Sequence, residues 1–132
     1  MCLVTTQLEP KIADKDIICY KLVERTKIKG IYKSHFLEFE YIIRRLYKNY
    51  FDIKYADMLI KRRYRQFAIE EGMFHSYTSS IYPMLSPSPY YALLKCIIPK
   101  GAYYYEGYFY DLPSYASSQI KILEEIKYGK II

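Results

Sequence analysis

Tryptophan is absent from this chain of 132 residues, and glycine, cysteine and histidine are scarce, at five, three and two residues. The glycines stand singly, which excludes a glycine-rich phosphate loop and a dinucleotide-binding fingerprint. Cys2, Cys19 and Cys96 are odd in number and lack paired spacing, so reduced thiols are expected rather than a disulfide framework. His35 and His75 lie far apart, without metal-ligand spacing. We therefore expect no metal site and no cofactor.

Long apolar runs are also missing. The longest, from Tyr90 to Pro99, is interrupted by Lys95 and is far shorter than the roughly 20 residues of a spanning helix. The first residues lack the basic and then apolar regions of a secretory signal. With 52% hydrophobic and 26% charged residues, the composition is typical of a folded, soluble protein. We expect one domain over residues 1–132, located in the cytoplasm and without a membrane partner.

Tyrosine is what the chain has in excess: 18 residues, together with a formal net charge of +6. Rigid rings with hydroxyl groups and a cationic surface suit a small anionic, aromatic ligand such as a nucleotide. More tyrosines than one small core can bury also predict a homo-oligomer. Two clusters hold much of the positive charge, Arg44, Arg45 and Lys48 in the first and Lys61, Arg62, Arg63 and Arg65 in the second. They are either solvated faces or anion-binding surfaces.

The pattern of apolar residues predicts an α+β fold, a single domain of mostly antiparallel sheet with one or two helices. Strands are expected over residues 16–24, 27–33, 93–98, 102–110 and 119–126, with Gly107 as a bulge or point of close approach. Residues 36–50 are ambiguous, and we favour a strand to about residue 42 followed by a short helix. Residues 52–71 form the better helix candidate, residues 79–89 a loop, and residues 111–114 a turn.

The candidate ligand-binding residues lie in three short strings, residues 72–78, 98–105 and 115–119, and in the second basic cluster. His75, Ser76 and Tyr77 offer neutral hydrogen bonds to a ribose or a base, and Lys100 and Arg63 could bind its phosphates. Tyr104 and Ser118 are candidates for stacking and hydrogen bonding. Each has a structural alternative: His75 bonded to the backbone, Arg63 on a solvated helix, and Tyr104 in the core. Alternation places Tyr103 and Tyr105 on one face and Tyr104 on the other, so at least one of these faces belongs to the core.

Residues 72–126 resemble the second half of ADP-ribosyltransferase-fold proteins. The resemblance rests on the order of Phe-His-Ser-Tyr, "LLKCIIPKGAYYYEG" and "YASSQIKILEE". In that family a late strand opens with a catalytic glutamate, whose position falls here at Gln119, and the resemblance therefore implies a degenerate, inactive site. The whole chain also resembles small uncharacterised proteins of gut-bacterial viruses that begin Met-Cys-Leu-Val-Thr and contain Ile-Pro-Lys-Gly. This second resemblance implies the cytoplasm of an infected host cell as the setting.

Three functions remain open. The first is a non-enzymatic viral anti-defence protein that binds and sequesters an NAD-derived or cyclic nucleotide signal, with no catalytic residues. The second is an inhibitor that binds protein or nucleic acid through a basic face; nucleic acid is possible but not favoured, because no known DNA-binding motif is present. The third is an active ADP-ribosyltransferase or nucleotide-cleaving enzyme, which would need Glu106, Glu124 or Glu125 as its carboxylate.

Overall fold

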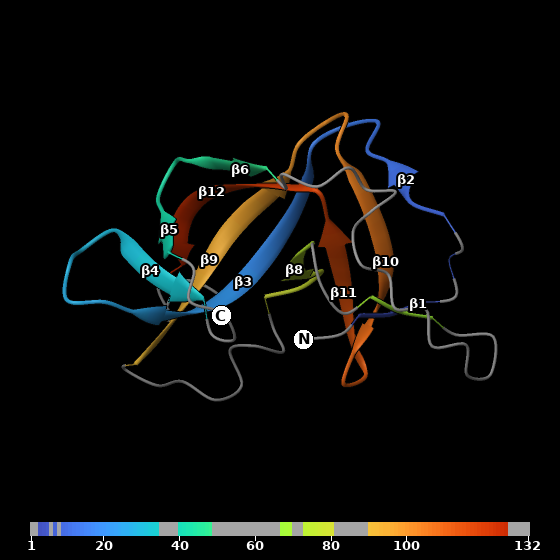
Figure 1. Cartoon of the computed structure of the whole chain (residues 1–132). Helices are drawn as coiled ribbons and strands as arrows, with labels where there is room; N and C mark the ends of the chain where they lie inside the picture. The colour runs from blue at the N-terminus through green and yellow to red at the C-terminus, as the bar shows by residue number, and fades with distance from the viewer. Residues whose placement is uncertain are drawn as a thin grey trace.

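The computed structural model describes residues 3–5, 7, 9–34, 40–48, 67–69, 73–80 and 90–126. Within these residues all regular structure is β-strand, and the strands pair in one antiparallel sheet (Figure 1). The strands are β1 (Leu3–Thr5), β2 (Lys11–Ile12), β3 (Ile17–Arg25), β4 (Ile31–Ser34), β5 (Glu40–Ile42), β6 (Leu46–Lys48), β7 (Phe67–Ile69), β8 (Phe74–Tyr77), β9 (Tyr91–Ile98), β10 (Tyr103–Phe109), β11 (Leu112–Ser117) and β12 (Gln119–Ile126).

The sheet runs in the order β6-β12-β9-β3-β8-β11-β10-β1-β7. On the far side of β3 from β9, β4 pairs with the end of the strand and continues the sheet to β5, and β2 pairs with the start of β10. Figure 1 shows β12, β9 and β3 curving together on one side and β11, β10 and β1 on the other. The short strand β8 joins these two parts, pairing with β3 at Tyr20 and with β11 over four residues. Segments distant in sequence thereby meet across β8.

The main core lies on one face of the sheet because apolar residues alternate along its longest strands. β3 supplies Cys19 and Val23, and β9 and β12 supply Leu94, Cys96, Ile98, Ile120 and Ile122. Tyr104 and Tyr115 pack against this cluster from β10 and β11. A smaller cluster of Leu3, Tyr105 and Ala116 occupies the other face of β10 and β11. Both faces of this hairpin are therefore packed, as alternation through Tyr104 and Tyr105 predicted for at least one.

The predicted α+β class is wrong, because the described residues contain no helix. The short helix predicted after about residue 42, from apolar residues spaced as in a helix, is replaced by a turn and the strand β6. Arg44 adopts a left-handed φ of 67°, which ends β5 and reverses the chain into β6. Tyr41 and Tyr47 then meet edge to face across this reversal, with their centroids 5.3 Å apart. The apolar spacing therefore reflects the packing of two rings from neighbouring short strands, not one face of a helix.

The helix predicted over residues 52–71 is also wrong where the structure describes it. Phe67–Ile69 form β7, which pairs antiparallel with Leu3–Thr5 near the start of the chain. A partner so remote in sequence leaves no trace in a local pattern. The rest of that predicted helix, the predicted strand before Glu40, and most of the predicted loop from residue 79 to 89 lie outside the described residues.

The strands predicted over residues 16–24, 93–98, 102–110 and 119–126 are confirmed as β3, β9, β10 and β12. Over residues 27–33 only the end is strand, since Gly30 has a φ of 85° in the turn that precedes β4. The turn predicted at residues 111–114 is shorter than expected. Tyr110 and Asp111 both have positive φ, as in the two-residue hairpin turn that matches strand twist, and Leu112 already begins β11.

Candidate functional site

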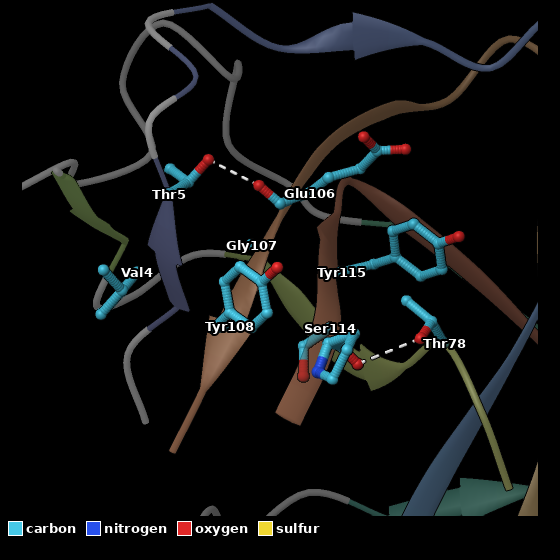
Figure 2. Close-up of a pocket in the computed structure, with 9 residues that line it drawn as sticks. Val4, Thr5, Thr78, Glu106, Gly107, Tyr108, Ser114 and Tyr115 are labelled. Carbon is cyan, nitrogen blue, oxygen red and sulfur yellow. Dashed lines mark hydrogen bonds between the residues drawn. The ribbon is translucent and has the colours of Figure 1, made fainter. Parts of the chain in front are cut away.

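A groove of about 400 Å³ lies over the middle of β10 and β11, between the end of β8 and β1. We call it the tyrosine groove; its lining residues are Val4, Thr5, Thr78, Glu106, Gly107, Tyr108, Pro113, Ser114 and Tyr115. Figure 2 shows the Tyr108 and Tyr115 rings on neighbouring strands and the Glu106 carboxylate on the side of Tyr115, directed away from Tyr108. The volume falls within the usual range for small-molecule sites. The lining includes two tyrosine rings, one carboxylate, two threonines and a serine.

Side chains on one face of the paired strands β10 and β11 form the floor of the tyrosine groove. Glu106 and Tyr108 project from the same face of β10, and Glu106 lies opposite Tyr115 in the β10–β11 register. The Tyr115 ring meets Tyr104 edge to face, with a centroid separation of 5.9 Å. That contact holds Tyr115 half-buried, whereas the Tyr108 ring is 57% exposed. One ring of the groove is therefore a fixed wall and the other is open to solvent.

The Glu106 backbone is held by side chains where β1 and β2 leave a gap along β10. Thr5 Oγ1 donates to the Glu106 carbonyl at 2.6 Å (Figure 2). The side-chain amide of Gln7 makes the hydrogen bonds that a neighbouring strand would make. It accepts from Glu106 N and donates to the Tyr104 carbonyl, both at 3.2 Å. These bonds satisfy backbone groups that a ladder would otherwise pair. The carboxylate thus extends from a fixed backbone.

At Gly107 the backbone of β1 lies close against β10. A Cβ added there would lie 2.1 Å from the carbonyl oxygen of Val4 and 3.1 Å from Cγ of Leu3. Glycine is therefore required for β1 to sit against β10 and form one wall of the groove. This confirms the close approach predicted at Gly107.

The charge in the tyrosine groove is balanced. Lys11 Nζ donates to Glu106 Oε2 at 3.1 Å in an exposed ion pair. The hydrogen bond from Lys11 to Glu106, and then the carboxylate charge, raise the pKa of the Lys11 ammonium. Burial first, and then the Glu106 carboxylate, raise the pKa of the Tyr115 phenol. Tyr115 therefore stays a neutral hydrogen-bonding ring beside a carboxylate and an ammonium.

No protein-family model, curated protein or solved structure matches the chain. The resemblances to ADP-ribosyltransferases and to viral proteins therefore stay predictions.

The predicted string His75, Ser76 and Tyr77 forms most of β8, but its side chains do not share a face. Ser76 is fully buried on the side of the main core, opposite Tyr115 in the register. His75 and Tyr77 project to the other face, where their rings meet edge to face at 5.0 Å. Strand alternation therefore prevents the three side chains from contacting one ligand. The next residue, Thr78, lines the tyrosine groove instead.

His75 lies in an aromatic and largely buried setting, with the Phe109 ring 5.0 Å away. Its Nε2 has no hydrogen-bond partner within the described part of the chain. Burial, and then the Lys21 ammonium, lower the pKa of His75 to about 3. The imidazole is consequently neutral at physiological pH, as the neutral hydrogen bonding predicted for it requires.

Lys100, Tyr104 and Ser118 lie toward the opposite end of β10 from the hairpin turn near His75. Lys100 is exposed in the β9–β10 turn, where its backbone N–H donates to Asp16 Oδ1 at 2.9 Å. The Ser118 hydroxyl accepts from the Tyr103 N–H at 3.0 Å, so it has a structural partner. Tyr104 packs against the main core, as its structural alternative held. None of the three lines the tyrosine groove, and Arg63 lies outside the described residues.

Sequence reasoning missed Thr78 and Tyr108 as groove residues, although it weighed Glu106 as a carboxylate. The alternation of Tyr104, Glu106 and Tyr108 along one strand was the available signal. It also missed Lys21, which is 7% exposed among the core-facing residues of β3. Lys21 Nζ donates to the His75 carbonyl and lies 5.1 Å from the centroid of the Tyr41 ring. Its position between Cys19 and Val23 in an alternating strand could have shown this.

The part of the chain that the structure describes contains neither a candidate metal site nor a membrane-spanning helix. No group of three or more histidine, cysteine, aspartate and glutamate side chains there could hold a metal ion. Among the same residues, no helix has the length and apolar character needed to cross a membrane.

Proposed function

We propose that this protein binds and sequesters a small nucleotide in the tyrosine groove without transforming it. The observation that carries the proposal is that two tyrosine rings line one groove together with a carboxylate that is itself paired with a lysine. A nucleotide offers three complementary parts, a flat base, a ribose diol and a phosphate. The tyrosine groove offers a partner for each of them.

The fit follows from the chemistry of each part. The base stacks on the exposed Tyr108 ring, with the half-buried Tyr115 as the adjoining wall. The ribose hydroxyls donate to the Glu106 carboxylate, the role that an acidic residue plays in dinucleotide-binding folds. Lys11 stands beside that carboxylate and can turn its ammonium toward a phosphate. The carboxylate also disfavours a long polyanion, which supports a small nucleotide over nucleic acid.

Binding without turnover is supported by the residues that line the groove. They include one carboxylate, Glu106, and no histidine or cysteine that could act as its partner in acid–base or nucleophilic catalysis. Glu125 is engaged by the Arg25 guanidinium and the Tyr32 hydroxyl on another part of the sheet. An active transferase would therefore have to rely on Glu106 or on Glu124, which is exposed on β12 and does not line the groove. The setting that we propose, a viral protein withdrawing an NAD-derived or cyclic nucleotide signal in the host cytoplasm, rests on the resemblances.

Calorimetry against cyclic nucleotides, NAD and ADP-ribose tests the proposal. We expect Tyr115→Leu and Tyr108→Leu each to weaken binding by about tenfold or more, because stacking of a base on a ring contributes about 1–3 kcal/mol. Tyr90→Leu is the matched control, since Tyr90 is exposed just before β9 and outside the groove.

Absence of heat with every ligand would reject the proposal, and so would equal losses in the Tyr90 control. Chromatography of the same samples checks for products. A product that disappears with Glu106→Gln would support the enzyme instead.

A further inference from the structure

Four cations converge at one end of the sheet, although the sequence separates them. Arg44 and Arg45 precede β6 and Lys48 ends it, while β12 contributes Lys121 directly opposite Leu46. All four side chains are exposed. None of them has an ion-pair partner within the described residues, where the two ion pairs are Lys11–Glu106 and Arg25–Glu125. This is a concentrated positive charge that the described residues do not neutralise with an ion pair.

The same end of the sheet presents a strand edge. β6 pairs with β12 through Leu46, Tyr47 and Lys48 and is the terminal strand of the described sheet (Figure 1). An edge strand has backbone N–H and C=O groups directed away from its single neighbour. Leu46 is 41% exposed on this strand, between the cations. The edge therefore offers backbone hydrogen bonds, an apolar contact and positive charge together.

The turn before β6 is held in a conformation that a residue with a long side chain rarely adopts. Arg44 has a φ of 67°, and its N–H donates to the Ile122 carbonyl at 2.8 Å. Ile122 N donates in turn to the Arg45 carbonyl at 3.0 Å. These two hydrogen bonds to β12 fix the backbone from which the Arg44 and Arg45 side chains project.

We propose that the β6 edge is a docking site for an extended acidic segment of a partner protein, which adds to the sheet as one further strand. Its backbone would pair with β6, an apolar side chain would cover Leu46, and its carboxylates would meet Arg44, Arg45, Lys48 and Lys121. A second copy of β6 is disfavoured because like charges would face each other. Nucleic acid would use the cations but neither the exposed Leu46 nor the backbone edge. This surface is separate from the tyrosine groove.

A fluorescent peptide that repeats Glu-Thr-Val-Thr, which places glutamate and valine on the same strand face, is the probe, and fluorescence anisotropy measures its affinity for the full chain. We expect Arg45→Ala combined with Lys121→Ala to weaken binding by about tenfold or more, since both charges lie at the contact. Lys27→Ala combined with Lys29→Ala removes two exposed lysines from the β3–β4 turn and is the control. That control should change the affinity by less than about twofold.

The same peptide with alternate backbone nitrogens methylated keeps its charge but loses strand pairing. We expect it to bind about tenfold more weakly, and hydrogen exchange at Leu46 and Lys48 to slow only with the unmethylated peptide. Absence of peptide binding would overturn the proposal. So would equal affinity of the methylated peptide, or tighter binding of an oligonucleotide that displaces the peptide, because either result would mean that charge alone is recognised.

Discussion

His75 is a neutral imidazole enclosed by rings, with a pKa lowered to about 3 by burial and by the Lys21 ammonium. In the unfolded chain its pKa would return to about 6.5. Between these two values the unfolded state holds a proton that the folded state lacks. The free energy of unfolding therefore falls as the pH drops from 6.5 toward 3, and His75 adds no pH dependence above that window.

We expect His75 to contribute up to about 1.4 kcal/mol of lost stability for each pH unit within this window. His75→Phe keeps a ring beside Tyr77 and Phe109 and removes both the titration and the buried nitrogen. Urea unfolding of both proteins at several pH values between about 4 and 7 measures the two slopes. Parallel slopes would contradict the assignment of a neutral, buried imidazole.

Single residues also show where sequence reasoning about the site reached its limit. Strand alternation was enough to predict that Tyr104 and Tyr105 lie on opposite faces, and the structure places each in a packed cluster. The same rule, applied to β8, would have divided His75 and Tyr77 from Ser76. The ion pair of Lys11 with Glu106 could not have been predicted from alternation, because it depends on the pairing of β2 with β10.

The contact between β1 and β10 depends on one absent side chain. We expect Gly107→Ala to cost about 2–3 kcal/mol of stability, because the new methyl group would overlap the Val4 carbonyl and force β1 away from β10. Ligand binding in the tyrosine groove should weaken in the same variant, since Val4 and Thr5 form its wall.

Gly30→Ala is the control for this prediction. Gly30 has a φ of 85° but open space around it, so the substitution adds backbone strain of about 1–2 kcal/mol without overlap. Thermal unfolding of the two variants gives the comparison. Equal losses of stability, with binding retained in Gly107→Ala, would show that the close approach is not required.

At the level of elements, strands were predictable where β-branched and aromatic residues formed one continuous run ended by a turn. β3, β9, β10 and β12 are of this kind. The strand predicted to end near residue 42 is confirmed over Glu40–Ile42, but helices were predicted where β6 and β7 form, each of three residues. So short a strand contains too few residues for a period to emerge, and its identity is set by its partner. The helices predicted there reflected apolar spacing alone.

For the molecule as a whole, the exposed apolar side chains lead us to expect self-association. Ile12 and Tyr103 are partners in the β2–β10 register and remain 61% and 40% exposed. Burying this pair in a homo-oligomer would remove apolar surface from water.

Light scattering at micromolar concentration should therefore give a mass above 15.9 kDa, and Ile12→Ser combined with Tyr103→Ser should reduce it. Tyr90→Ser serves as the control because Tyr90 is more exposed but outside this pair. A wild-type protein that scatters as a monomer would rule out the association.

The hydrogen bond from Thr5 to Glu106 joins residues separated by 101 positions. During synthesis the start of the chain leaves the ribosome long before β10 exists for it to pair with. β9, β10, β11 and β12 follow one another closely and can pair soon after they emerge, whereas β1 has to wait, because closing so long a loop is slow. The wall formed by Val4 and Thr5 is then among the last parts to assemble, and a newly made chain gains the tyrosine groove only when folding is nearly complete.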